Sequence, residues 1–409
     1  MVGQTQRFEV DDGASVSFSS VLGNYGGIMT VKNGGILTLK SFSQYGDVVI
    51  SGAGSKIVNT KNIAMKESLA PARLFVKDGG LLSMETSHIQ IGAQGGTNAN
   101  MYVTDGGTVV CRGINVGLAT TNATYTHAPY DCKLLVTGEG STVTFNSLTV
   151  GHAEGGGTTY AVGCCTNGHD NVVYVTEGGQ MSGSDSANIG FTCSSNALVV
   201  TSGGRFSCSE LNIGRSRTGA VGTYKAEQVA TDNRCVVADG TIEATMFSLR
   251  GIRTSCHVTN GVVRAASTNS IDDVTDYLQI AGTNSLLKGD LAFHVKCNGG
   301  RIDFVLPKDG YARAPIQSDG KVLIDEATEL GLLPPAEAGK TAKAYILMQV
   351  PASGVLYVPD NALAGLRSSL ATLAAKDHRF EDYYVTMVSE GGYRRLLVKR
   401  HDGTLVLFK

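Results

Sequence analysis

Three long segments of the sequence carry most of the side chains that could bind a ligand or do chemistry. They span residues 117–133, 151–172 and 214–234 and mix tyrosines with histidines, carboxylates and arginines. The candidate binding residues are Tyr125, Tyr130, Asp131, His152, Glu154, Tyr160, His169, Asp170, Arg215, Arg217 and Tyr224. Tyrosines among mixed charges could bind a glycan or a protein surface, because a ring offers both an apolar body and a hydroxyl. Ordinary variable surface loops are the simpler alternative.

The same segments offer three carboxylates for acid–base chemistry. Hydrolysis of a glycosidic bond needs two carboxyl groups at a defined separation, and Asp131, Glu154 and Asp170 could meet. No carboxylate pair occupies adjacent strand positions in consecutive copies of the chain's repeat, where a rigid site would be held best. The sequence also contains no tryptophan for a sugar-stacking cleft. We therefore expect no catalytic site, with a polysaccharide lyase or glycoside hydrolase as the alternative.

The cysteines do not indicate a metal site. There are nine, and no two are separated by the two residues that zinc ribbons require. We therefore expect neither a bound metal nor a cofactor. Cys235 and Cys256 hold the same repeat position and should face a core, where cysteine packs as a small hydrophobe. Cys132 could form a disulfide with Cys164 or Cys165 if the protein is exported.

One repeat organises the first 280 residues: apolar, any, apolar, any, then a turn containing glycine. The second apolar positions of eleven copies are Val10, Val31, Ile50, Val76, Val103, Val136, Val175, Val200, Val237, Val258 and Ile280. A second alternating pair usually follows the turn, and a third pair ends in glycine in five copies. Those glycines are Gly92, Gly117, Gly151, Gly190 and Gly214. Each copy therefore predicts three short strands, because apolar residues alternate with period two.

A unit of three short strands cannot bury its own inward face, but stacked units can. The repeat therefore predicts an all-β fold, a right-handed parallel β-helix of about eleven coils over residues 1–288. The right hand is expected because the coils vary in length and show no strict hexapeptide. Neighbouring strands should lie about 4.8 Å apart along the stack.

Several phrases of the repeat resemble a known family. They read VTDGGTVV, VTGEGSTVTFNSLTVGH, VTEGGQ and VTSGGRFSCSELNIG, and the resemblance covers roughly residues 8–290. The chain is similar here to the passenger regions of bacterial autotransporter-type surface proteins. The resemblance implies an extracellular or cell-surface protein, most often an adhesin. We expect the leader and the membrane anchor of such a protein to lie outside this chain.

The final part of the chain, residues 289–409, lacks the regular repeat. Prolines and charged residues become frequent, and residues 361–376 read as one helix capped by Asp360 or Asn361. The helix should bury one stripe of leucines: Leu363, Leu366, Leu370 and Leu373. We expect irregular final coils and a small α+β cap that covers the end of the stack. A separate ligand-binding domain is the alternative.

One outward position of the first strand is apolar in seven consecutive copies. These residues, called the apolar stripe below, are Val49, Phe75, Tyr102, Leu135, Tyr174, Val199 and Val236. An apolar patch of this length indicates something that covers it, such as the C-terminal helix, a long loop or another protein. Ladder stacking of good strand formers is the simpler alternative.

Composition narrows the class of function. The net charge is −2 with no basic stripe, which argues against nucleic acid, and no apolar run is long enough for a membrane-spanning helix. We expect a non-enzymatic, secreted or cell-surface scaffold, adhesin-like, that presents long loops on one edge. A structural fibre segment is a further alternative. Expected partners are a glycan or a host cell-surface protein, or a second copy through the apolar stripe or the uncapped N-terminal coil.

Overall fold

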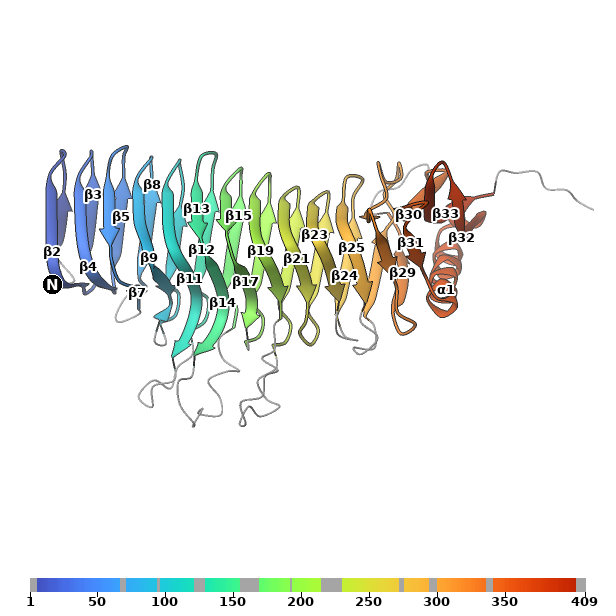
Figure 1. The fold of residues 1–409 in the computed structure, drawn as a ribbon, viewed down its shortest axis with the longest axis horizontal. Helices are drawn as coiled ribbons and strands as arrows, with labels where there is room; N and C mark the ends of the chain where they lie inside the picture. Colours follow the sequence, from blue (N-terminus) through green and yellow to red (C-terminus); the bar gives the residue numbers. More distant parts are fainter. Residues whose placement is uncertain are drawn as a thin grey trace, which may run out of the picture. The chain divides into compact units, whose positions relative to one another are not determined.

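The computed structural model describes residues 6–66, 71–93, 96–120, 129–154, 169–191, 193–214, 230–271, 276–293, 300–335 and 341–401. They belong to two compact units, Met1–Ser255 and Cys256–Lys409. Both units consist mainly of parallel strands (Figure 1). The prediction of an all-β parallel solenoid is confirmed.

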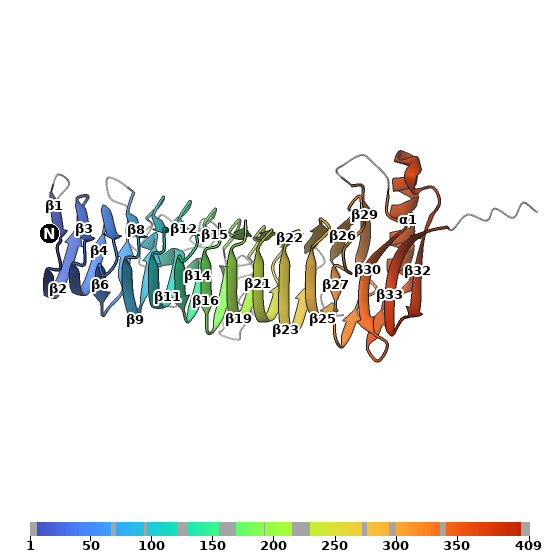
Figure 2. The ribbon, with the colours of Figure 1, turned by 90° about the horizontal axis from the view of Figure 1, so that it is seen from above.

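The first strands of the coils form one parallel ladder in the first unit (Figure 2). In ladder order they are β1 (Arg7–Val10), β3 (Ile28–Lys32), β5 (Asp47–Ser51), β8 (Arg73–Lys77), β10 (Asn100–Val103), β12 (Lys133–Thr137), β15 (Val172–Thr176), β18 (Ala197–Thr201) and β20 (Arg234–Ala238). The register keeps equivalent repeat positions together, as where Val48 lies opposite Leu74. Every second side chain is therefore buried, which is why the apolar residues alternate.

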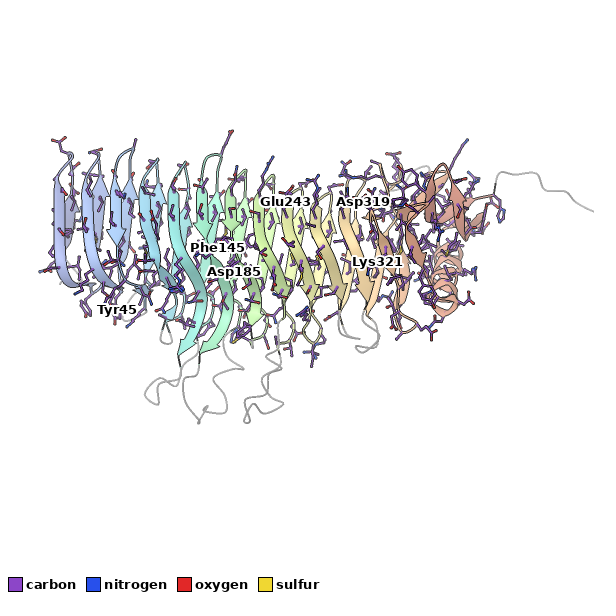
Figure 3. The ribbon with its side chains drawn as sticks, in the orientation of Figure 1. Tyr45, Phe145, Asp185, Glu243, Asp319 and Lys321 are labelled. Atoms are coloured by element: carbon purple, nitrogen blue, oxygen red, sulfur yellow. The ribbon has the colours of Figure 1, made fainter. Side chains whose placement is uncertain are left out.

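The second and third strands of each coil complete the first unit. They are β2 (Ser15–Asn24), β4 (Ile36–Gln44), β6 (Lys56–Asn59), β7 (Ile63–Met65), β9 (Leu81–Ile91), β11 (Thr108–Thr120), β13 (Thr142–Phe145), β14 (Ser147–Glu154), β16 (Gln180–Gly183), β17 (Ser186–Phe191), β19 (Arg205–Ile213) and β21 (Thr241–Leu249). In six coils the two strands merge into one long element, with a register shift near Cys111 in β11 and near Phe18 in β2. Inside the coils, Phe145 of β13, labelled in Figure 3, packs on Phe206 of β19 with ring centroids 6.1 Å apart.

The second unit continues the same architecture and then changes it. Its strands are β22 (Ser255–Thr259), β23 (Val262–Ile271), β24 (Tyr277–Ala281), β25 (Leu286–Phe293), β26 (Arg301–Val305), β27 (Ile316–Gln317), β28 (Lys321–Leu323), β29 (Glu329–Leu333), β30 (Ala344–Pro351), β31 (Val355–Tyr357), β32 (Tyr383–Glu390) and β33 (Tyr393–Arg400). Parallel pairing runs past residue 288 through β24, β26 and β29. The order β30–β33–β32 is antiparallel and ends the sheet.

One helix, α1 (Asp360–Lys376), packs against β29 and β32 of its own unit. Its span confirms the predicted helix, and the predicted leucine stripe is buried. The predicted N-cap position is wrong, because Pro359 occupies it, and Asn361 Oδ1 accepts from the backbone N–H of Ala362 at 3.0 Å within the first turn instead. Proline at this boundary needs no backbone N–H, and the Asn361 amide instead donates to the carbonyl oxygen of Glu326.

Two different physical constraints explain the glycines in the turns that follow the first strands. In the turn after β10, Asp105 and Gly106 have φ angles of +51° and +76°, the left-handed region that aspartate tolerates and glycine prefers. Gly107 is required by contact instead, since a Cβ there would lie 2.1 Å from the carbonyl oxygen of Val76 in the preceding coil. The stack therefore needs a residue without a side chain at this position.

The glycines that end the third strands leave room for a buried asparagine ladder. Asn171, Asn196 and Asn233 each directly precede a first strand and are fully buried. Asn196 Oδ1 accepts from the backbone N–H of Asn171 at 3.2 Å, and Asn233 Oδ1 accepts from that of Asn196 at 2.9 Å. A Cβ on Gly190, whose φ is +74°, would lie 2.0 Å from the side chain of Asn233. The glycine and the asparagine of neighbouring coils thus fit as a pair.

Six cysteines lie in the described part of the chain, and all are buried. They are Cys111, Cys132, Cys193, Cys208, Cys235 and Cys256. The prediction that Cys235 and Cys256 face a core is confirmed. Cys132 is also buried, with its Sγ 3.4 Å from the carbonyl oxygen of Gly96, whereas we expected it in a surface loop. Its predicted partners Cys164 and Cys165 lie outside the described residues.

Burial should make two of these thiols unreactive while the protein is folded. Desolvation raises the pKa of Cys111 and of Cys208 to about 12, so almost no thiolate exists at mildly alkaline pH. We expect iodoacetamide to leave both unmodified in the native protein and to modify both in guanidinium chloride. Peptide mapping by mass spectrometry measures this, and rapid labelling of either thiol in the native state would contradict the packing described here.

Candidate functional site: one corner of the coils and one outward face

The corner before each first strand has the same backbone in successive coils. Its residues with positive φ, between 52° and 58°, are Asn98, Asp131, Asp170, Ser195, Asp232 and Arg253. Their backbone N–H groups bond from coil to coil, as where Asp131 donates to the carbonyl oxygen of His169 at 3.3 Å and Asp170 to that of Ser195 at 3.1 Å. The corners lie on the edge of the coils opposite to the Gly-Gly turns (Figure 1).

Four of the predicted binding residues meet at this corner in two consecutive coils. The rings of Tyr130 and His169 stack with centroids 5.5 Å apart and planes 15° apart. His169 Nδ1 lies 2.8 Å from Asp170 Oδ2, and Lys133 Nζ lies 2.8 Å from Asp131 Oδ1. Tyr130 remains 44% exposed, so one aromatic face and several polar groups are available to a ligand.

The other predicted binding residues are placed only in part. The backbone of His152 and of Glu154 belongs to β14, opposite Leu118 and Thr120 of β11. The remaining candidates lie outside the described residues: Tyr125, Tyr160, Arg215, Arg217 and Tyr224. The described site is therefore the Tyr130–His169 stack with the carboxylates of Asp131 and Asp170.

The two corner carboxylates have a sufficient structural explanation. Asp131 and Asp170 hold matching positions in neighbouring coils, two residues before Lys133 and Val172, which pair in the ladder. Asp232 holds the same position and forms a bidentate ion pair with Arg253, at 2.7 and 2.6 Å. Aspartate is favoured here because it tolerates the left-handed backbone. Among the residues that the structure describes, no three metal-ligating side chains gather.

The apolar stripe is a continuous column on the outward face of the first strands. Ladder pairs join its members one to the next, from Val49–Phe75 to Val199–Val236, without a register shift. All seven side chains are partly exposed. Phe75 and Tyr102 stack with centroids 4.9 Å apart and planes 9° apart. Ladder stacking therefore buries part of each side chain, and a flat apolar face remains.

The cap contains a groove that sequence reasoning did not identify. Its volume is about 540 Å³, and it lies between α1 and β32. The lining includes Arg367, Leu370, Ala374, Phe380, Tyr384 and Val385. The sequence feature that could have indicated this groove is the set of alanines on α1. Small side chains leave space between a helix and a strand that carries aromatic residues.

Comparison of the chain with protein-family models, with curated proteins and with solved structures finds no significant match. Within the described ranges, no helix is both long and apolar enough to cross a membrane. We therefore infer the function from the residues and their geometry alone.

Proposed function

We propose that the protein is a non-enzymatic scaffold that binds a glycan through the loop-side corner of its coils, as an adhesin does. The observation that carries the proposal is the Tyr130–His169 stack, which places an exposed aromatic surface on a fixed backbone corner. A stacked ring next to carboxylates can contact the apolar face of a sugar and accept bonds from its hydroxyl groups. We also propose that the chain works outside the cell, as part of a passenger-like surface protein.

The scaffold supports such a site because its corner cannot easily move. Backbone hydrogen bonds join Asp131 to the coil that follows, and the buried asparagine ladder lies directly behind the corner. A site on rigid elements loses less conformational entropy when it binds than one on a free loop. Each corner carboxylate already has a partner within the protein, Lys133 for Asp131 and the His169 imidazole for Asp170, and these contacts hold the polar groups in place beside the ring.

Replacing Tyr130 by alanine should weaken glycan binding by roughly tenfold or more, because the stacking surface and its buried area are lost. We expect a similar loss of glycan binding for the His169→Ala variant. Retention of the purified chain on a polysaccharide array, with the far-UV spectrum as a check on folding, measures both. Release of reducing or unsaturated sugar from the array would contradict a non-enzymatic role.

A matched control is available at the far end of the first unit. Tyr25 is 45% exposed and stacks on Tyr45, which Figure 3 labels, with centroids 5.0 Å apart, so Tyr25 resembles Tyr130 in exposure and in aromatic contact. We expect Tyr25→Ala to retain binding. Equal losses in the Tyr25 and Tyr130 variants, or no loss in either, would refute the corner as the binding site.

A further inference from the structure

The apolar stripe is nearly symmetrical about its central residue. Leu135 lies at the middle, with Tyr102 and Tyr174 one coil away on either side. Phe75 and Val199 follow at two coils, and the stripe ends with valines at three coils, Val49 and Val236. A reversed copy of the stripe therefore places Tyr102 opposite Tyr174 and Val49 opposite Val236, as pairing of one patch with itself in an isologous interface allows.

Two charged residues beside the stripe have opposite signs and would face each other if one copy were reversed. Asp47 flanks the stripe in the coil of Val49, and Arg234 flanks it on the same side in the coil of Val236. These two coils lie equally far from Leu135 in opposite directions. In a reversed copy, the exposed guanidinium of Arg234 therefore meets the carboxylate of Asp47, which Arg73 already binds at 2.7 Å.

We propose that two copies of this chain pair through the apolar stripe in an antiparallel homodimer. The two-fold axis lies between the two sheets, runs along the strand direction and passes beside Leu135 of both copies. Tyr102 of each copy then contacts Tyr174 of the other, and Val49 contacts Val236. The proposal does not depend on glycan binding at the corner.

The central coil permits this arrangement despite its lysine. Lys133 flanks Leu135 and would face Lys133 of the second copy, but its ammonium group already binds Asp131 at 2.8 Å, so the local charge is balanced. On the other flank, the hydroxyl of Thr137 in the central coil donates to the carboxylate of Glu177 at 2.9 Å, and Thr176 and Thr201 of the two following coils join their hydroxyl groups at 3.1 Å. The facing surfaces are thus apolar along the stripe, with the Lys133–Asp131 ion pair at the middle of one rim and threonine hydroxyls, one of them bonded to the Glu177 carboxylate, on the other.

The size of the stripe predicts a reversible dimer. Seven coils at the ladder spacing cover roughly 30 Å, and the three outward columns of a strand cover roughly 15 Å. Two such faces bury about 900 Å² together, near the lower end of specific interfaces, which corresponds to a weak or transient association. We therefore expect a dissociation constant in the micromolar range, with monomer and dimer both present over accessible concentrations.

Disulfide trapping tests the symmetry directly. A residue on the two-fold axis meets its own counterpart, so Leu135→Cys should cross-link to itself under mild oxidation. Val49→Cys should not, yet it should cross-link when mixed with Val236→Cys. Thr149→Cys, partly exposed on the third strand β14, is the matched control, the wild-type chain shows the contribution of native cysteines, and peptide mapping identifies each bond.

Sedimentation over a concentration series tests the energetics with a second set of variants. Arg234→Glu should weaken the dimer about tenfold. Adding Asp47→Arg should restore part of the lost affinity, because the exchanged charges face each other again while Arg73 loses its carboxylate partner. Absence of a dimer at every concentration, a Val49–Val49 cross-link, or no cross-link at position 135 above the wild-type level would each overturn the proposal. A double variant that binds no more tightly than Arg234→Glu alone would overturn the reversed register.

Discussion

Replacing Gly107 by alanine is expected to lower the free energy of unfolding by roughly 3 kcal/mol, at the upper end of the range for overpacked sites. The added methyl group would lie 2.1 Å from the carbonyl oxygen of Val76, which belongs to the ladder of the preceding coil and cannot turn away. Two coils must therefore separate locally, and ladder hydrogen bonds are lost with them. Urea unfolding followed by far-UV circular dichroism measures the change.

The neighbouring glycine is the control for this experiment. Gly106 has a φ of +76°, but no atom lies closer than 3.9 Å to a Cβ built on it. Alanine there should lower the free energy of unfolding by roughly 1–2 kcal/mol, which is the cost of a residue with a side chain in the left-handed backbone conformation. A larger loss for Gly106→Ala than for Gly107→Ala would show that backbone conformation, and not contact between coils, explains the repeated glycines.

Replacing Asn196 by leucine should cost about 4 kcal/mol, because each buried polar group left without a partner costs about 1–3 kcal/mol. The Asn196 side chain accepts from the backbone N–H of Asn171 and from its side-chain amide, and donates to the carbonyl oxygen of Ser194 at 2.8 Å. Leucine has the same number and branching of side-chain heavy atoms but offers none of these bonds. Urea unfolding gives the total loss, and hydrogen exchange at the Asn171 amide locates it.

An exposed asparagine of the same unit is the matched control. Asn146 lies between β13 and β14 with its side chain exposed, and only its backbone bonds across coils: its N–H donates to the carbonyl oxygen of Arg112, and its carbonyl oxygen accepts from the N–H of Asp185, both at 2.9 Å. We expect Asn146→Leu to change the free energy of unfolding by less than about 0.5 kcal/mol. Unchanged protection of the Asn171 amide in Asn196→Leu would show that the ladder does not hold the corner.

Alternation of apolar residues was enough to predict the coils, because a parallel ladder with one buried face leaves period two in the sequence. Each copy of the repeat was recognised by alternation followed by a turn that contains glycine, so the last copy recognised was the one that includes Ile280. β26 and β29 carry the same alternation, but Pro307 and Pro334 follow them in place of glycine. The residue types of the turns change after Ile280, whereas those of the strands do not. For this reason β26 and β29 were not recognised as first strands.

The corner could be predicted only in part. Tyr130, Asp131, His169 and Asp170 were identified by residue type, but their stacking depends on a left-handed backbone that alternation does not report. The asparagine ladder was missed because its members lie between segments of different length. Aligning the copies on their first strands shows an asparagine directly before three consecutive strands, a signal present in the sequence.

The difference between the two edges of the coils limits where this protein can accept new sequence. At the edge of the Gly-Gly turns, the gap between β10 and β11 or between β12 and β13 is four residues, and backbone of one coil touches backbone of the next. At the corner edge, the gap ranges from Gln44–Asp47 to Ile213–Arg234. A foreign peptide inserted at the corner edge would leave the ladder in register. The same insertion at a Gly-Gly turn would separate two adjacent coils. Natural variation in length should therefore accumulate on one side of the stack only, which makes that side the place to display an epitope.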